Sequence, residues 1–342
     1  MTDTAAPPLW AAPRAHEPVD ATVELPGSKS LANRELVLAA IAEGPGVVSR
    51  ALRSRDTELM AAALTSLGSV VDTSGPDWRV TPGIVRTPAD PVAVDCGLAG
   101  TVMRFVPPVA ALRASPVAFD GDPHARSRPM AAVLTALRSL GVRLDGEQDR
   151  LPFTVLGAGS VRGGEVVIDA SASSQFLSAL LLAAPAYELG VDIRHDGKPI
   201  PSVPHVEMTL ACLRARGVEV DDSDVDRWRV LPGPVAARDV TIEPDLSNAA
   251  PFLMLAMTSG GTVRVPGWPF STTQAGDALR AILAEMGAEV VRTPEGLQVT
   301  GGGRIRPLVA DLHAVGELTP VLAAVCALAD GRSELTGIGP LR

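Results

Sequence analysis

Apolar and polar positions along this chain follow a pattern that recurs at a nearly constant interval. Four segments end alike, as "LTSLGSVV", "LRSLGVRL", "LRARGVEV" and "LAEMGAEV". In each, the pattern predicts an amphipathic helix that stops at a glycine and then an alternating strand. The glycines are Gly68, Gly141, Gly217 and Gly287, spaced 73, 76 and 70 residues apart (68 to 141, 141 to 217, 217 to 287). This regular spacing indicates an internal structural repeat.

A second kind of helix, rich in alanine and leucine, opens each repeat. Its copies are "ANRELVLAAIAEG", "GTVMRFVPPVAAL", "SSQFLSALLLAAP" and "SNAAPFLMLAMTSGG", and a fifth is "GELTPVLAAVCALADG". Each unit therefore reads helix, strand, helix, strand, strand, which predicts an α/β (α+β) fold. The sequence thus contains five opening helices but only four closing helices.

The last unit is cut short. The chain stops at Arg342, just after the predicted strand "SELTGIG". A repeat that cannot complete its sheet leaves strand edges and an apolar face uncovered. We therefore expect this sequence to be a fragment of a longer protein; a short natural terminus with a degenerate last unit is the alternative.

Length and composition narrow the possible classes. With 342 residues, 46% of them hydrophobic, the chain has enough apolar material for two domains. A net charge of −9 with 3% aromatic residues argues against a nucleic-acid-binding protein. Cys96, Cys212 and Cys326 are far apart and favour a reducing compartment over a disulfide framework or a zinc site. We see no secretory signal and no apolar run long enough to span a membrane, so we expect a soluble cytoplasmic protein.

Candidate chemistry lies in the loops that precede the opening helices. "PGSKSLANR" contains Lys29, one of only two lysines in the chain, the other being Lys198. Its glycine, hydroxyls and helix-start amides suit an anion, with Lys29 as a compact charge and Arg34 as a bidentate one. An ordinary solvated helix cap is the alternative for such a loop. The rarity of lysine favours the functional interpretation.

Two further openings have the same character, and a third loop adds arginines. "DCGLAGTVMR" places Gly97 and Gly100 at a helix start, where bare backbone amides are open to an anion. "DASASSQF" offers Ser171, Ser173, Ser174 and Gln175, and "GDPHARSRPM" offers Arg126 and Arg128. Each loop alone fits an ordinary N-cap or a solvated turn. Three such openings in consecutive repeats favour a shared phosphate or carboxylate site.

These segments resemble a known family. "LPGSKSLANRELVLAAIAEG", "CGLAGTVMRF", "GDPHARSRPM", "SASSQFLSALLLAAP" and "PSVPHVEMTL" occur in the order found in 5-enolpyruvylshikimate-3-phosphate synthases, and the resemblance extends from about residue 21 to residue 342. It implies a two-domain enolpyruvyl transferase fold built from βαβαββ units, with the last units missing here. Residues 1–21 and 242–342 would form one incomplete domain, and residues 22–241 an inserted domain of three units, with crossings near Thr22 and Thr241.

The resemblance also implies a reaction. The family transfers the enolpyruvyl group of phosphoenolpyruvate to the 5-hydroxyl of shikimate 3-phosphate and releases phosphate, through a tetrahedral intermediate and without metal or organic cofactor. Its members are usually monomers, so we expect small-molecule substrates as the partners, and neither nucleic acid nor membrane. Because both substrates are anions, the rare ammonium of Lys29 would neutralise charge and exchange a proton, which arginine does not do.

Site residues follow from the same resemblance. The catalytic pair would be Lys29 and Glu317. Shikimate 3-phosphate would be bound by Lys29, Ser30, Arg34, Ser173, Ser174, Gln175, Ser202 and Glu317. Phosphoenolpyruvate would be bound by Lys29, Gly100, Arg128 and Gln175.

The chain departs from the family pattern at several positions. Glu317 stands where the family usually has aspartate, and a helix N-terminal acid favoured by the helix dipole is its alternative interpretation. His205 replaces a common tyrosine, and Leu98 a common asparagine. The family's second catalytic carboxylate, its phosphoenolpyruvate arginines and a late lysine would come after Arg342. We therefore expect the fragment to be inactive alone.

Two rival functions stay open. One is a UDP-N-acetylglucosamine enolpyruvyl transferase, which shares the repeat fold but carries a reactive cysteine where this chain has "GDPHARSRP". The other is a non-catalytic fragment that binds shikimate 3-phosphate.

Overall fold

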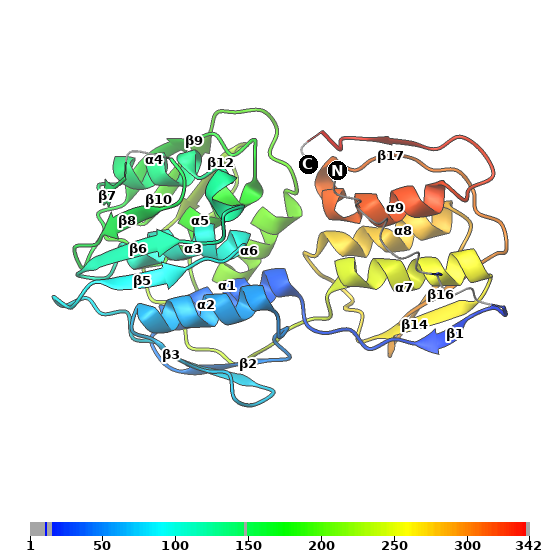
Figure 1. The fold of residues 1–342 in the computed structure, drawn as a ribbon, viewed down its shortest axis with the longest axis horizontal. Coiled ribbons are helices and arrows are strands. Elements are labelled where there is room, and N and C mark those ends of the chain that lie inside the picture. Colours follow the sequence, from blue (N-terminus) through cyan, green and yellow to red (C-terminus); the bar gives the residue numbers. More distant parts are fainter. Residues whose placement is uncertain (1–10, 12–15, 147–148, 340–342) are drawn as a thin grey trace, which may run out of the picture.

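The chain forms two lobes joined by two crossings (Figure 1). The structure is a computed structural model that describes residue 11, residues 16–146 and residues 149–339. The first lobe comprises the elements from α1 to β13, and the second comprises β1 and the elements from α7 onward. Among the helices of the described residues, none is long and apolar enough to cross a membrane.

The first lobe contains three units of one plan. The first unit has α1 (Lys29–Ala40), β2 (Gly46–Ser49), α2 (Arg55–Ser66), β3 (Val70–Asp72) and β4 (Trp78–Thr81). The second has β5 (Val92–Asp95), α3 (Gly100–Ala110), β6 (Pro116–Asp120), α4 (Ala131–Ser139), β7 (Arg143–Asp145) and β8 (Phe153–Leu156). The third has β9 (Gly164–Ile168), α5 (Ser174–Ala183), β10 (Val191–His195), α6 (Pro204–Ala215), β11 (Val220–Asp221) and β12 (Arg227–Val230), and β13 (Val240–Thr241) leaves the lobe.

The second lobe repeats the plan. Its first unit has β1 (Asp20–Thr22), α7 (Leu246–Ser259), β14 (Thr262–Pro266), α8 (Leu279–Glu285), β15 (Glu289–Thr293) and β16 (Gly296–Thr300). Its second has β17 (Val309–Asp311), the 3-10 segment η4 (His313–Leu318), α9 (Thr319–Cys326) and β18 (Glu334–Thr336). Short 3-10 turns are η1 (Ala125–Ser127), η2 (Ala184–Ala186) and η3 (Ala275–Ala278). The predicted order of helices and strands is confirmed, with five opening and four closing helices in the described part of the chain.

The sheets of the two lobes share one strand order, but two of them take their leading strand from a distant part of the chain. Four four-stranded sheets share one order, in which a leading strand lies parallel to the second strand: β13-β2-β4-β3, β5-β6-β8-β7, β9-β10-β12-β11 and β1-β14-β16-β15. The leading strand of the first sheet is β13, about 190 residues after its partner, and the leading strand of the fourth sheet is β1. In β17 and β18 only the leading pair is present among the described residues.

The two crossing segments run side by side in opposite directions. The amide of Ser28 donates to the carbonyl of Glu243 at 2.8 Å, and the amide of Asp245 donates to the carbonyl of Pro26 at 2.9 Å. Between them, a Cβ on Gly27 would lie 2.0 Å from the carbonyl oxygen of Arg50, so only glycine fits. The predicted domains, residues 22–241 and residues 1–21 with 242–342, are units expected to fold separately. Separate folding stays a prediction.

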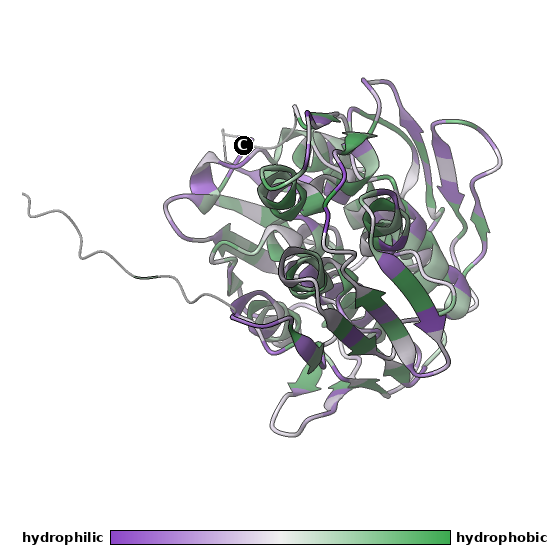
Figure 2. Ribbon diagram, turned by 90° about the vertical axis from the view of Figure 1, so that its right-hand side faces the viewer, coloured by the Kyte–Doolittle hydropathy of each residue, from purple (hydrophilic) through white to green (hydrophobic). Residues whose placement is uncertain are grey.

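Each lobe has its own apolar core. Buried apolar side chains from Ala32 to Ile242 form one cluster, and Leu25 with side chains from Leu246 to Val325 forms the other. The opening helices α1, α3 and α5 pack on one another and are buried on nearly every side. Figure 2, which looks nearly along the helix axes, shows helices in the middle and strands around them. Burial on nearly every side explains why α3 and α5 are largely apolar and why Arg34 and Glu35 of α1 are held in buried hydrogen bonds, whereas the closing helices are amphipathic.

All four closing helices end in the same motif. Gly68, Gly141, Gly217 and Gly287 have φ between 77° and 116°, each one residue beyond the C-cap. After α6, for example, the amide of Gly217 donates to the carbonyl of Arg214 and that of Val218 donates to the carbonyl of Leu213. This pair of bonds is the Schellman motif, which needs a left-handed residue and therefore favours glycine.

Replacing Gly217 with alanine is expected to lower the free energy of unfolding by about 1–2 kcal/mol, the cost of a left-handed backbone for a residue with a Cβ. No atom lies within 4 Å of the added Cβ, so the effect isolates backbone strain. Urea unfolding followed by circular dichroism measures it. Gly233→Ala is the matched control, because Gly233 also has open space but no left-handed φ. An equal loss in both variants would contradict the assignment.

Candidate active site

A cavity of about 460 Å³ lies between the two lobes. We call it the cleft. The first lobe lines it with Ser28, Lys29, Ser30, Leu52, Ser54, Arg55, Asp56, His205 and Met208, and the second with Asp245, Ser247, Asn248, Gln274, Ala275 and Glu317. The cleft therefore brings together Lys29, Ser30 and Glu317, which the sequence separates by almost 290 residues. None of the three cysteines lines it.

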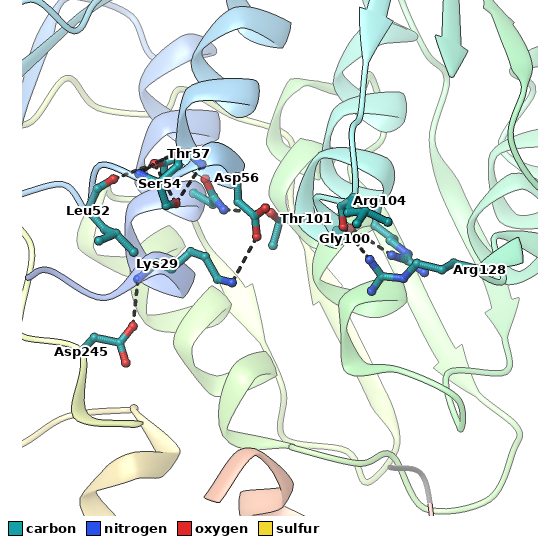
Figure 3. A network of polar contacts seen from close by, with 12 residues as sticks. Lys29, Leu52, Ser54, Asp56, Thr57, Gly100, Thr101, Arg104, Arg128 and Asp245 are labelled. Atoms are coloured by element: carbon teal, nitrogen blue, oxygen red, sulfur yellow. Dashed lines mark hydrogen bonds and ion pairs between the residues drawn. The ribbon is translucent and has the colours of Figure 1, made fainter. Parts of the chain in front are cut away.

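Lys29 is the first residue of α1, behind the N-cap Ser28. Its Nζ lies 3.1 Å from Oδ2 of Asp56 in the first turn of α2, and the side chains are 46% and 28% exposed (Figure 3). Its backbone amide donates to Oδ2 of Asp245 at 3.2 Å, while Oδ1 of Asp245 caps α7 at Asn248. The carboxylate of Asp245 thus links the first turn of α1 to the first turn of α7, beside the ammonium of Lys29.

Asp56 is a site residue that the sequence analysis missed. It sits in "SRDTE", where a capping box of Ser54 and Thr57 already accounts for an acid at a helix start. Its position in the first turn of a closing helix gave no reason to place it beside Lys29. Only the packing of α2 against α1 brings the two charges together.

Arg34 is buried behind the cleft rather than exposed in it. The residue is 2% exposed. Its guanidinium donates to Thr209 Oγ1 at 2.7 Å and Ser178 Oγ at 3.3 Å, and to the carbonyls of Ser30 and His205 at 2.9 Å each. Burial lowers the pKa of Arg34 to about 10. The arrangement ties α1 to α5 and α6, and the predicted contact of Arg34 with substrate stays a prediction.

A second cationic group lies at the start of α3. The N-cap Ala99 provides no side-chain hydrogen bond, so the first amides of α3 have no cap there. A Cβ on Gly100 would lie 2.8 Å from Nη2 of Arg128 and 3.0 Å from Nη1 of Arg104. Figure 3 shows both guanidiniums beside Gly100. Bare amides and two arginines around a glycine form an anion-binding arrangement.

Arg104 is the other residue that the sequence analysis missed. It is 3% exposed, donates to the carbonyls of Gly100 at 3.3 Å and Pro129 at 3.0 Å, and leaves Nε without a partner among the described residues. Burial, together with the charge of Arg128, lowers the pKa of Arg104 to about 9. An arginine inside the otherwise apolar "GTVMRFVPPVA" was the signal available in the sequence.

The structure separates the two arginines of "GDPHARSRPM". Arg126 makes a bidentate pair with Asp120, with distances of 2.9 and 2.6 Å. Arg128 donates to the carbonyl of Leu98 at 2.8 Å and forms no ion pair within the residues that the structure describes. Arg128 is therefore the arginine of this loop that keeps charge available for a ligand.

The serine loop before α5 is organised by local hydrogen bonds. Ser173 is the N-cap of α5, and its Oγ accepts from the amide of Gln175 at 3.2 Å. Ser171 donates to the carbonyl of Lys198 at 3.0 Å, which ties this loop to the one that carries Ser202. Ser202 has φ of 53°, and its amide donates to the carbonyl of His313 in the second lobe at 3.2 Å.

Glu317 closes the cleft from the second lobe. It lies in η4 (His313–Leu318), before α9, and its side chain is 28% exposed. Burial raises the pKa of Glu317, as does the charge of Asp245, while a hydrogen bond from Ser247 opposes the rise. A carboxylate made more basic in this way suits a proton acceptor. His205 stands opposite, with Nε2 at 4.0 Å from Oε1 of Glu317.

Several predicted residues do not line the cleft: Arg34, Gly100, Arg128, Ser173, Ser174, Gln175 and Ser202. The neighbour of Gly100, Thr101, is linked to α1, the helix that carries Lys29 and Ser30, because its Oγ1 accepts from Asn33 at 2.8 Å. A larger cavity of about 790 Å³ lies over β5, β6 and β8 and contains none of the predicted residues. Its lining includes Asp95, Asp120, Asp122 and Asp145, a charge that disfavours an anionic ligand.

Comparison with known proteins gives one consistent family. Residues 13–342 match the family model described as EPSP synthase (3-phosphoshikimate 1-carboxyvinyltransferase). A 3-phosphoshikimate 1-carboxyvinyltransferase from Kocuria rhizophila is 55% identical over 344 residues, which cover 98% of this chain and 77% of the relative.

Solved structures show the same fold at low identity. The EPSP synthase of Acinetobacter baumannii superposes with a TM-score of 0.78 at 22% identity, covering 94% of this chain and 74% of that one. The enolpyruvyl transferase NikO of Streptomyces tendae gives 0.70 at 15% identity, covering 94% and 76%. The expected α/β enolpyruvyl transferase fold is confirmed.

Proposed function

Because this chain belongs to the EPSP synthase family, we propose that its cleft binds shikimate 3-phosphate and phosphoenolpyruvate and that its residues act in enolpyruvyl transfer in the shikimate pathway. The chain is thus a transferase of the 3-phosphoshikimate 1-carboxyvinyltransferase type. The observation that carries the site proposal is the cleft itself, where Lys29 and Ser30 of one lobe face Glu317 of the other.

Lys29 supplies the charge that two anionic substrates need. Its ammonium is about half exposed and pairs with Asp56 at 3.1 Å in the lining of the cleft, within reach of a ligand there. When an anion arrives, Lys29 moves from Asp56 to the ligand, and the exposed pair costs little to separate. Unlike a guanidinium, an ammonium also exchanges a proton with the reacting carbon or oxygen.

Glu317 is proposed as the proton acceptor for the 5-hydroxyl. Its raised pKa makes its carboxylate a stronger base than an exposed glutamate. In the addition step the hydroxyl oxygen bonds to C2 of phosphoenolpyruvate as its proton passes to Glu317, while the C2–C3 π bond breaks and C3 takes a proton from the Lys29 ammonium. Phosphate then leaves C2 as C3 gives up a proton, which restores the double bond. The alternative, an acid that only stabilises the start of α9, predicts that removing the charge of Glu317 leaves phosphate release unchanged.

The group around Gly100 is proposed as the phosphate end of the phosphoenolpyruvate site. Amides at the start of α3 and the guanidinium of Arg128 donate to phosphate oxygens. Arg104 supports this surface from below by holding the carbonyls of Gly100 and Pro129. Ser173, Ser174, Gln175 and Ser202 are proposed to bind shikimate 3-phosphate, with Arg34 behind them. The monomeric state and the cytoplasmic location expected from the sequence are also proposals.

Calorimetric titration tests the substrate assignment, because binding depends only on residues within this chain. We expect shikimate 3-phosphate to bind, and UDP-N-acetylglucosamine to give no heat. Binding of the nucleotide sugar instead would favour the rival transferase. Release of phosphate from phosphoenolpyruvate only when shikimate 3-phosphate is present separates turnover from binding without chemistry.

The variant Glu317→Gln tests the role of this carboxylate, since glutamine has nearly the size of glutamate but carries no charge. Where phosphate release by the parent is measurable, we expect the variant to abolish it while shikimate 3-phosphate still binds. Equal, measurable release by the variant and the parent would exclude Glu317 as the proton acceptor; the expected inactivity of the chain alone stays a prediction.

A further inference from the structure

The imidazole of His205 and the carboxylate of Glu317 face each other across the cleft. Nε2 of His205, in the first turn of α6, lies 4.0 Å from Oε1 of Glu317 in η4. The two side chains are 23% and 28% exposed, and both line the cleft with Lys29 and Ser30. This is a contact between the lobes at the point where the proton acceptor is proposed.

The position of His205 is fixed by its backbone. Its carbonyl accepts from Nη2 of Arg34 and from Oγ1 of Thr209, each at 2.9 Å. Burial, together with the charge of Arg34, lowers the pKa of His205 to about 4. The ring is therefore neutral at pH 7, and it holds one N–H donor and one acceptor.

Glu317 is fixed from the other side. In the same 3-10 segment, the carbonyl of His313 accepts from the amide of Ser202, and Nε2 of His313 donates to the carbonyl of Ile200, both at 3.2 Å. These bonds hold η4 against the loop before α6. The other charged groups around the pair are Arg34 behind the ring, Asp245 beside Glu317, and Lys29, Arg55 and Asp56 in the cleft lining.

We propose that His205 is a positioning residue for Glu317, whose carboxylate accepts the Nε2–H of the ring when the lobes approach by about 1 Å. The bond orients one carboxylate oxygen and leaves the other for the substrate hydroxyl. That last step rests on the proposed function, but the contact between the two side chains does not. His205 keeps its proton throughout, and the substrate proton goes to Glu317.

The electrostatic consequence is specific. A donor to the ionised carboxylate favours the charged form and opposes the effects of burial and of Asp245. Removal of the donor must therefore make Glu317 more basic. A residue that merely filled space at position 205 would not change the titration of Glu317.

Carbon-13 NMR of the chain with labelled glutamate tests this directly. The Glu317 signal is the one that disappears in Glu317→Gln. We expect His205→Phe to raise the pKa of Glu317 by up to about one unit with shikimate 3-phosphate bound, and by less in the free chain. His205→Gln, which places an amide N–H near the position of Nε2, should restore most of the original value. His16→Phe, at an exposed histidine outside the cleft lining, is the matched histidine control.

An unchanged pKa of Glu317 in His205→Phe, in both the free and the bound chain, would overturn the proposal. Failure of the parent chain to bind shikimate 3-phosphate would count against the proposed function alone, because the free-chain titration needs no ligand. His205→Leu replaces His205→Phe if the larger ring prevents folding, which circular dichroism reports.

A double-mutant cycle gives a second test. We expect His205→Phe to weaken binding of shikimate 3-phosphate by about 3- to 10-fold in the parent chain, and to have no further effect in Glu317→Gln. Equal weakening in both backgrounds would mean that His205 acts through the fold and would also overturn the proposal.

Discussion

Replacing Arg216 with methionine is expected to lower the free energy of unfolding by about 3–5 kcal/mol, because it leaves the carboxylate of Glu35 buried and unpaired. The Arg216 side chain is fully buried, and that of Glu35 is 6% exposed. Nε and Nη2 of Arg216 lie 3.0 and 2.7 Å from the same oxygen of Glu35, and Nη1 donates to the carbonyl of Ala236 at 3.0 Å. The pair joins α1, the end of α6 and the segment that returns to the second lobe.

Urea unfolding compares this variant with Arg138→Met. Arg138 pairs with Asp149 at 2.9 Å, but these side chains are 39% and 50% exposed, so its loss should cost about 0–1 kcal/mol. The double variant Glu35→Met/Arg216→Met should recover much of the loss, since a matched apolar pair needs no desolvated charge. Similar losses for Arg216→Met and Arg138→Met would show that burial does not decide the strength of these pairs.

Replacing Arg128 with methionine is expected to weaken phosphoenolpyruvate binding by about 10- to 150-fold, the loss of one charge-assisted contact. Its guanidinium lies beside Gly100 and the uncapped start of α3 and forms no ion pair in the described part of the chain. Equilibrium dialysis of labelled phosphoenolpyruvate, with shikimate 3-phosphate present, measures the change.

Arg126→Met is the control in the same loop. Arg126 is already held by Asp120 in an exposed pair whose charges largely cancel, so its removal should change binding less than about threefold. Raising the salt concentration should reduce the parent's affinity but leave the Arg128→Met variant less affected. Equal losses for the two arginines would remove Arg128 from the proposed site.

Only some of the site residues could be predicted from the sequence. Loops before helices pointed to Lys29, Ser30 and Gly100, because glycine, hydroxyls and a rare lysine at a helix start form a local pattern. The family resemblance added Glu317, which has no local signal beyond an acid before a helix. Asp56 and Arg104 were missed because an acid in a capping box and an arginine in an apolar helix each have ordinary structural explanations.

The burial of Arg34 could not be predicted from its local sequence either. In the sequence it is an arginine one turn into a polar helix start, which suggests an exposed charge. Packing of α5 and α6 against α1 surrounds it with the hydroxyls of Ser178 and Thr209 and with the carbonyl of His205. Whether an arginine meets solvent, ligand or protein depends on neighbours more than 140 residues away.

The sequence by itself determined the repeat, the type and order of its helices and strands, and the four glycine caps. These features depend on periodicities of 2 and 3.6 residues and on backbone conformations open to glycine, which are local properties. The family resemblance implied crossings near Thr22 and Thr241, and the structure shows that β1 and β13 are the strands exchanged there. Tertiary structure alone decided that Lys29 meets Asp56 and that His205 faces Glu317 across the cleft. Such contacts join segments that are 27 to more than 200 residues apart, and their energy comes from burial and packing that no local pattern contains.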